Sequence, residues 1–391
     1  MYETVSPGAG RYPRVSINLQ TIEFNARAVV SLCADSGVRL VGVVKGAGAL
    51  IPVAAAMARG GCSALASSRL SQLRALRDAM GGGTDGGTDG IPSGLPLGLL
   101  RIPGPSEVAE AVAAADWSLQ SDATALGLTA TEAGKVGRRH GVTLMLDLGD
   151  LREGWFDEGE LVAQAVRVER ELPSLYLRGV GTNLGCYGSI RPTPENLGRL
   201  VSAARRVEDA IGRRLDVVSG GATSSLPLIV RGDMPHGVTE LRVGEGMLCA
   251  RDLPCYHGTD VPGVRSDAFT LRAEIVEIRK KPSYPVGERC VDAFGRCPDY
   301  DDRGERTRLL LAVGKRDFGD HAQLVPRDIR VRIIGSSSDH LICEADEPCA
   351  DLRYGSILEF DLFYGAMLFL CDGDPYVGIE YVRVDTASQP S

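Results

Sequence analysis

Short apolar runs alternate with amphipathic stretches from residue 14 to about residue 250. Residues 38–44 (Val-Arg-Leu-Val-Gly-Val-Val) are mostly apolar, which is typical of a strand covered on both faces. Similar strands are predicted at residues 14–19, 62–66, 98–101, 117–120, 143–148, 179–182, 216–219 and 240–243. Helices are predicted between them at residues 21–34, 51–59, 70–80, 106–115 and 195–211. Roughly eight strand–helix units fit an α/β fold, a (β/α)₈ barrel over residues 12–255, with a doubly wound parallel sheet as the alternative.

A different pattern begins at about residue 267, where strand-like runs are separated by Gly, Pro and Asp turns. These runs lie at residues 268–279, 308–313, 329–334, 340–344, 357–362 and 366–370. They predict a second, mainly β domain over residues 265–385. Two domains also agree with the length of 391 residues, because a single core stops growing at roughly 250–300 residues.

Composition narrows the class of protein. The chain is 44% hydrophobic and 24% charged, as in an ordinary globular protein, and its net charge of −8 argues against nucleic acid or an anionic membrane as a partner. It contains neither an apolar run of about 18 residues nor an N-terminal leader pattern, so we expect a cytoplasmic protein. Residues 81–90 (Gly-Gly-Gly-Thr-Asp-Gly-Gly-Thr-Asp-Gly) predict a disordered surface loop.

The ten cysteines and five histidines do not form a recognisable framework. They are scattered along the chain without Cys-x-x-Cys or His-x-x-x-His pairs. We therefore expect reduced thiols and no metal site.

Lys45 stands out as a candidate for chemistry. It ends the apolar run at residues 38–44 and opens a glycine turn, Lys45-Gly-Ala-Gly48. Burial lowers the pKa of a lysine and makes its amine a nucleophile that can form a Schiff base. Taken alone, the pattern also fits a solvated strand end.

Three further motifs lie at the predicted ends of barrel strands, where active sites of such barrels occur. Residues 147–154 (Asp-Leu-Gly-Asp-Leu-Arg-Glu-Gly) combine three carboxylates with a guanidinium, although a solvated loop has the same composition. Residues 219–225 (Ser-Gly-Gly-Ala-Thr-Ser-Ser) offer flexible backbone and hydroxyl groups suited to a phosphate, or to a plain turn. Arg242, inside the apolar segment 241–246, needs a carboxylate or a ligand as partner.

Together with residues 181–188 (Gly-Thr-Asn-Leu-Gly-Cys-Tyr-Gly), these motifs resemble the pyridoxal-phosphate racemases of the alanine racemase fold. The closer likeness is to the ornithine racemase branch, through four motifs in the same order. They are residues 147–154, Lys281-Pro-Ser283, Asp292-Ala-Phe-Gly295 and Ser337-Ser-Asp-His340. The resemblance extends from about residue 14 to residue 380 and implies an isomerase that uses pyridoxal 5′-phosphate.

The resemblance also implies roles for individual residues. Lys45 matches the lysine that carries the cofactor, Arg242 the arginine on the pyridine nitrogen, and Arg152 the arginine beside the ring and the substrate carboxylate. The phosphate would be bound by Thr223, Ser224, the backbone at Gly244 and Glu245, and Tyr364 of the second domain. The chain departs from the family at Ala49, Met145 and Ala222, where the family has a tyrosine, a carbamylated lysine and an asparagine.

Racemisation implies two bases, one on each face of the α-carbon. Lys45 is the base on its own face. In alanine racemase the opposite base is a tyrosine, and the position matched to it here is Phe294, which cannot exchange a proton. Asp339, His340 and Cys186 are the candidates for the second base.

The substrate and the assembly follow from the same resemblance. Asp150 replaces an apolar position of alanine racemase, so it is predicted to bind the distal ammonium of ornithine or lysine; its alternatives are a salt bridge with Arg152 or a helix cap. Asp299, Asp301 and Asp302 are further acidic candidates. The family's homodimer implies that residues 290–340 complete the partner's active site. A decarboxylase or retro-aldolase, and a cofactor carrier without turnover, are the alternative functions.

Overall fold

The computed structural model describes residues 10–81, 90–372 and 375–382. The chain divides into two compact units, each treated separately below: a barrel unit, Leu19–Arg265, and a β unit that joins Met1–Asn18 to Ser266–Ser391. Residues 82–89 of the predicted glycine-rich loop lie outside the described residues.

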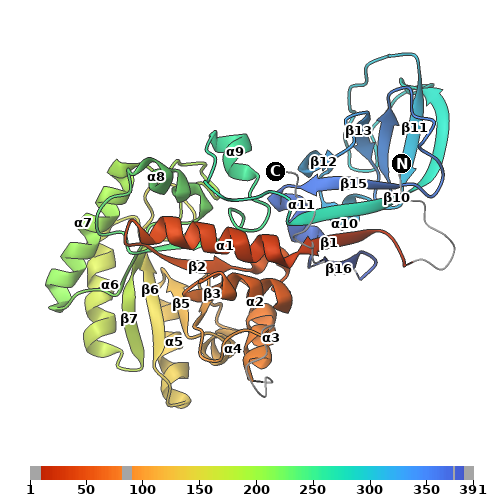
Figure 1. Cartoon of the computed structure of the whole chain (residues 1–391). Coiled ribbons are helices and arrows are strands. Elements are labelled where there is room, and N and C mark those ends of the chain that lie inside the picture. The colour runs from red at the N-terminus through yellow and green to blue at the C-terminus, as the bar shows by residue number, and fades with distance from the viewer. Residues whose placement is uncertain (1–9, 82–89, 373–374, 383–391) are drawn as a thin grey trace. The chain divides into compact units, whose positions relative to one another are not determined.

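Eight parallel strands close into a barrel, which confirms the predicted (β/α)₈ architecture (Figure 1). They are β2 (Arg39–Val43), β3 (Ala64–Ser67), β4 (Leu97–Leu99), β5 (Trp117–Gln120), β6 (His140–Met145), β7 (Leu175–Gly181), β8 (Val217–Ser219) and β9 (Glu240–Val243). The barrel closes between β9 and β2, with Val41 opposite Arg242. This register brings Arg242 to the strand that ends just before Lys45.

Helices follow most of the strands and cover the barrel (Figure 1). The longer ones are α1 (Leu19–Ala34), α2 (Ile51–Arg59), α3 (Leu70–Gly81), α5 (Ala123–Lys135), α6 (Glu158–Glu171) and α7 (Pro194–Ile211); the short ones are α4 (Val108–Ala114), α8 (Leu226–Arg231) and α9 (Asp252–His257). In α7, Thr193 accepts the Asn196 N–H and Asn196 accepts the Thr193 N–H. This reciprocal capping satisfies backbone groups at the start of the helix.

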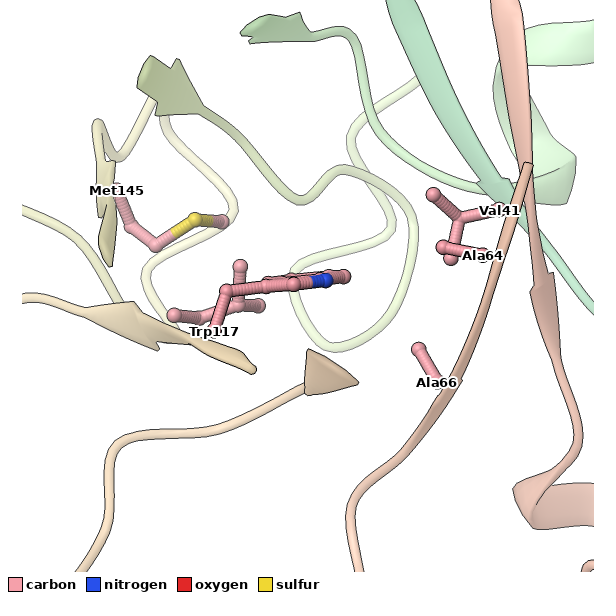
Figure 2. Close-up of a cluster of buried hydrophobic side chains, with 6 residues drawn as sticks. Val41, Ala64, Ala66, Trp117 and Met145 are labelled. Atoms are coloured by element: carbon pink, nitrogen blue, oxygen red, sulfur yellow. The ribbon is translucent and has the colours of Figure 1, made fainter. Parts of the chain in front are cut away.

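Side chains fill the interior of the barrel. Trp117 and Met145 pack with Val41, Ala64 and Ala66 in a buried cluster (Figure 2). The guanidinium of Arg178 lies 4.4 Å from the Trp117 ring centroid and forms an ion pair with the buried Glu240, the first residue of β9. Side chains therefore fill the barrel interior, and a site is expected at the carboxyl ends of the strands, where the loops begin.

The β unit is built around one long strand, β10 (Phe269–Pro282). Its main sheet runs in the order β12-β15-β10-β11-β14-β13. The other strands are β11 (Glu305–Leu311), β12 (Leu324–Pro326), β13 (Val331–Ser336), β14 (Leu341–Ala345), β15 (Ile357–Leu362) and β16 (Gly378–Val382). A short helix, α10 (Lys315–Phe318), follows β11.

Two predicted elements were wrong. The strand expected at residues 14–19 as part of the barrel is β1 (Arg14–Asn18), which pairs with β10 and β16 in the β unit. The strand expected at residues 366–370 lies instead in helix α11 (Tyr364–Leu370). In α11, Ala366, Met367 and Leu370 are buried at helical spacing. Such a short apolar run fits a strand or a helix until its packing partners are known.

Candidate active site

Lys45 lies at the carboxyl end of β2, as the first residue of a 3₁₀ turn, Lys45–Ala47. The turn ends with Gly48 and Ala49, both at positive φ (58° and 51°). Burial lowers the pKa of Lys45; of the charges nearby, Arg152 and Arg242 lower it, whereas Cys186 and Glu153 raise it. The predicted amine is therefore half-buried and surrounded by ionisable side chains.

Arg242 is 3% exposed and is held by three acceptors. Its guanidinium donates to Ser219 Oγ, to the Thr182 carbonyl at 2.8 Å and to Asn183 Oδ1 at 2.7 Å. A guanidinium has five N–H donors, so two have no acceptor within the described part of the chain. The hydroxyl of Thr182 is also buried without a hydrogen-bond partner among the described residues. These unused polar groups are what a site that binds a polar ligand requires.

A chain of polar side chains links Arg242 to the loop after β6. Asn183 accepts from Arg242 and donates to Glu153, and Arg152 donates to Glu153 with an Nη2–Oε1 distance of 2.7 Å. The predicted Arg152 therefore belongs to the same network as Arg242. Sequence reasoning missed Asn183 as a site residue and left Glu153 as one carboxylate of a motif, although its position next to Arg152 was a usable signal.

The predicted phosphate turn faces the end of β9. Thr223 Oγ1 accepts the Gly246 N–H at 3.2 Å, so its hydroxyl proton remains available to a ligand. The Ser224 hydroxyl instead donates to the Leu184 carbonyl at 2.8 Å, and Ser225 donates to the Gly220 carbonyl at 2.7 Å. Thr223 is thus better placed as a donor than Ser224, whose oxygen can still accept.

Gly244 and Glu245 were predicted to contribute backbone groups. A Cβ at Gly244 would lie 2.9 Å from the Val43 carbonyl oxygen, so only glycine lets β9 approach the end of β2 this closely. The Glu245 carboxylate turns away and accepts the Arg251 and Asp252 N–H groups at 2.7 and 3.0 Å. Burial and, second, the Asp252 charge raise the pKa of Glu245 to about 7. Its side chain therefore belongs to the packing behind the site.

Asp150 has different partners from those predicted. It is 1% exposed, and its carboxylate accepts the N–H groups of Gly185, Tyr187 and Ile190 at 3.0, 3.0 and 3.3 Å. Burial acts to raise the pKa of Asp150, but these hydrogen bonds outweigh it and leave the pKa lowered. A Cβ at Gly188 would lie 2.6 Å from the Asp150 carbonyl oxygen. Asp150 thus anchors the loop of residues 184–190, and its only described partners are backbone groups.

The remaining predicted residues separate into two groups. Cys186 is exposed on the loop that Asp150 anchors, and it is an electrostatic neighbour of Lys45, Arg152 and Arg242. Phe294, Asp339, His340 and Tyr364 belong to the β unit, which is described separately from the barrel. Met145, at the family's lysine position, is fully buried beside Trp117 (Figure 2).

Comparison with known proteins agrees with the fold. The model of the alanine racemase N-terminal domain matches residues 17–252, more than half of the chain. The chain belongs to the alanine racemase family. An ornithine racemase of Acetoanaerobium sticklandii is 36% identical over 357 residues, covering 91% of this chain and 96% of its own. A lysine racemase of Thermotoga maritima is 33% identical over 358 residues, covering 91% and 95%.

Solved structures agree with the family. An alanine racemase from a D-cycloserine-producing Streptomyces lavendulae has a TM-score of 0.70 at 20% identity, covering 96% of this chain and 98% of its own. A D-threonine aldolase from Filomicrobium marinum has a TM-score of 0.69 at 16% identity, covering 95% and 91%. These structural likenesses support the fold alone. The family and the two named racemases confirm the predicted class, an amino-acid racemase. Among the described residues, no helix is both long and apolar enough to cross a membrane.

Proposed function

We propose that the protein is a pyridoxal-phosphate-dependent racemase of a basic amino acid such as ornithine or lysine. The observation that carries the proposal is that Lys45, just after the end of β2, lies close enough to Arg242 of the adjacent strand β9 for the two charges to interact. Lys45 has a lowered pKa, and Arg242 retains two N–H donors without acceptors in the described chain. The two relatives, named for ornithine and lysine, support the substrate class.

The side chains present fit the cofactor. Lys45 would hold its aldehyde, Arg242 would donate to the ring nitrogen, and Thr223 would donate to the phosphate. Arg152 would bind the substrate carboxylate, and Tyr364 of the β unit would add a phosphate contact. Pyridoxal phosphate, when bound, supplies an electron sink that makes the α-hydrogen of an amino acid acidic.

The protein's own groups would then move the proton. Because its pKa is lowered, a larger fraction of Lys45 is neutral near pH 7 and can act as a base on one face of the α-carbon. Since Arg242 keeps its proton at any physiological pH, it binds the ring nitrogen without protonating it. Hydrogen bonds through Asn183 and Glu153 link Arg242 to Arg152. This network would hold both guanidinium groups in position during the reaction.

We further propose a homodimer in which residues 290–340 of one protomer complete the site of its partner. Large apolar side chains are exposed on both surfaces concerned. Around the barrel site, Leu151 is 66% and Tyr187 72% exposed; within residues 290–340, Val291 is 60% and Phe294 44% exposed. Exposed apolar groups concentrated in this way are typical of surfaces that another chain covers.

A second candidate is a decarboxylase or retro-aldolase using the same cofactor. It is favoured by one observation, that the position matched to the family's second base is Phe294. Such a reaction needs only one proton-exchanging group at the α-carbon.

Isotope exchange separates these reactions. Each enantiomer of ornithine, and then of lysine and alanine, is incubated with the protein and cofactor in heavy water, and the product is analysed for deuterium and configuration. The proposal predicts deuterium at Cα with inversion, fastest for the basic amino acids, and loss of both in Lys45→Ala but not in the exposed control Lys280→Ala. Release of carbon dioxide or an aldehyde without inversion would contradict it.

A further inference from the structure

Two motifs of the β unit, Asp292–Gly295 and Ser337–His340, converge on one side chain that neither contains, Lys315. The Lys315 Nζ lies 4.0 Å from the centroid of the Phe294 ring, and the Lys315 N–H donates to the Ser337 carbonyl at 3.0 Å. Lys315 thus contacts the Asp292–Gly295 motif through its amine and the Ser337–His340 motif through its backbone N–H. Both motifs lie in the β unit and belong to the resemblance with ornithine racemases.

Lys315 opens onto a cavity. The cavity has a volume of about 340 Å³, and its walls include Phe294, Arg296, Arg316 and Ser338. Lys315, Arg296 and Arg316 supply three cations to a wall with one carboxylate, Asp320. This balance favours an anionic group such as an amino-acid carboxylate.

The backbone of Lys315 is firmly placed while its amine is not engaged by a carboxylate. The Asp317 carboxylate accepts the Gly314 N–H at 2.8 Å, and a Cβ at Gly314 would collide with Ser338 and Asp339. Only glycine therefore lets α10 start against the Ser337–His340 motif. Within the part of the chain that the structure describes, the Lys315 amine makes no ion pair or hydrogen bond, and the ring of Phe294 is its close neighbour.

We propose that, in the proposed homodimer, Lys315 of one protomer is the second proton-exchanging residue in the site of its partner, acting on the face of the α-carbon opposite the Lys45 of that site. This rests on the proposed function. Lys45 removes the α-proton from one enantiomer, and the ammonium of Lys315 returns a proton to the other face; the reverse direction exchanges the two roles. The two lysines recover their starting protonation by exchange with solvent, so protons and electrons balance.

The alternatives predicted from sequence fit this task less well. Asp339 and His340 are exposed and do not line the cavity beside Phe294. Asp339 already accepts from Ser338 at 2.6 Å and lies 3.9 Å from Arg316. Phe294 itself has no exchangeable proton, but its ring positions an amine that has one.

The test compares Lys315→Met with Lys280→Met, an exposed lysine of the same unit, in the cofactor-loaded protein. Absorbance of the bound cofactor and its attachment to Lys45, fixed by borohydride and located by peptide mass spectrometry, should stay unchanged in both variants. Racemisation by Lys315→Met should fall at least about 100-fold, the contribution expected of a general base or acid. In heavy water, α-exchange should persist for the enantiomer whose proton faces Lys45 and disappear for the other.

Two results would overturn the assignment. One is racemisation by Lys315→Met within threefold of the parent. The other is equal loss of α-exchange from both enantiomers while attachment at Lys45 is intact, since a missing second base leaves the Lys45 side working. A parent protein that neither binds the cofactor nor exchanges any α-proton would instead refute the proposed function, so the two failures are distinguishable.

Discussion

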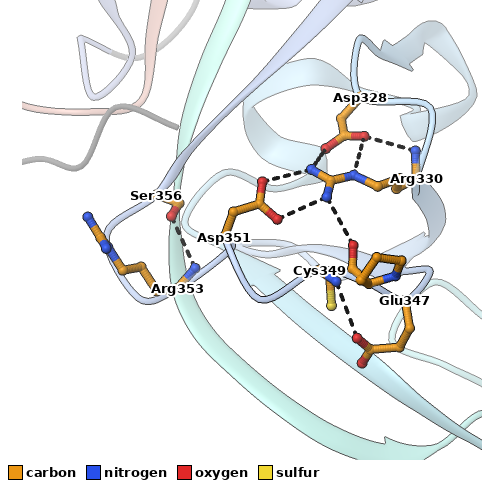
Figure 3. A network of polar contacts seen from close by, with 8 residues as sticks. Asp328, Arg330, Glu347, Cys349, Asp351, Arg353 and Ser356 are labelled. Carbon is orange, nitrogen blue, oxygen red and sulfur yellow. Dashed lines mark hydrogen bonds and ion pairs between the residues drawn. The ribbon is translucent and has the colours of Figure 1, made fainter. Parts of the chain in front are cut away.

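Two arginines of this protein are surrounded by oxygen acceptors and differ in how completely their donors are used. In the β unit, Arg330 is held by both oxygens of Asp328, both oxygens of Asp351 and the Pro348 carbonyl, at 2.9–3.2 Å (Figure 3). In the barrel, Arg242 has three acceptors, and none of them is a carboxylate. The hydrogen bonds to Asp351 and Asp328 raise the pKa of Arg330, whereas burial lowers that of Arg242.

The difference distinguishes a structural arginine from a binding arginine. The chain itself satisfies Arg330, which ties two loops together at a half-buried position. Burying the Arg242 guanidinium costs desolvation free energy, which its three hydrogen bonds only partly offset. A bound ligand would supply acceptors for its two remaining N–H groups. The following predictions test this distinction, from the largest effect to the smallest.

Replacing Arg242 by lysine should reduce racemisation by about 100-fold or more. Lysine keeps the charge but lacks the planar donor set that reaches Ser219, Thr182 and Asn183 while leaving donors for a ligand. Steady-state rates and the cofactor spectrum measure the effect, with Arg330→Lys as the matched control. Equal losses of racemisation rate in Arg242→Lys and Arg330→Lys would contradict the distinction between a binding arginine and a structural one.

The proposed dimer predicts that two inactive variants restore each other. When Lys45→Ala and Lys315→Met subunits are mixed under exchange, half of the dimers become hybrids with one complete site. Activity should return to about a quarter of the parent value. Hybrids verified by mass that stay inactive would exclude the contribution of Lys315 to the partner's site.

Asp150→Asn should lower kcat/KM about tenfold, to a similar extent for ornithine and for alanine. Its carboxylate anchors residues 184–190 through three backbone N–H groups, and an amide accepts such bonds more weakly. A loss confined to the basic substrates would instead support the role predicted from sequence, in which Asp150 binds the distal ammonium.

Glu245 should destabilise the fold at alkaline pH. Its pKa is raised from 4.5 to about 7, so the folded state binds more protons than the unfolded state between these values, and stability falls as pH rises through them. Glu245→Gln should therefore be more stable than the parent by about 3 kcal/mol at pH 8 and equally stable below pH 4. Urea unfolding at both pH values measures this, with exposed Glu288→Gln as control; a pH-independent difference would contradict it.

Arg330→Met should have the smallest effect. Activity should be unchanged, and the melting temperature should fall by roughly a few degrees at most, because exposed ion pairs contribute little to stability. A large loss of racemisation would show that the Arg330 cluster is not merely structural.

Features that depend on residues close together in the sequence could be predicted, whereas contacts between residues far apart in the sequence could not. Parallel strands buried on both faces appear as apolar runs, so the barrel and the strand-end position of Lys45 were predicted correctly. The partner of a strand is not encoded in its own pattern, and residues 14–18 were therefore assigned to the wrong unit. Motif reasoning selected Arg242 and Arg152, but not Asn183 and Glu153, which link them across separate loops. The backbone partners of Asp150 come from residues 35–40 positions away, a contact that spacing does not reveal.

The most direct test of the central claim is to locate the cofactor on the chain. The purified protein is loaded with pyridoxal phosphate, reduced with borohydride, digested and analysed by mass spectrometry. We predict one modified peptide, carrying the cofactor on Lys45, and no such peptide in Lys45→Ala. Modification at another lysine with Lys45 untouched, or the absence of any adduct, would contradict the account.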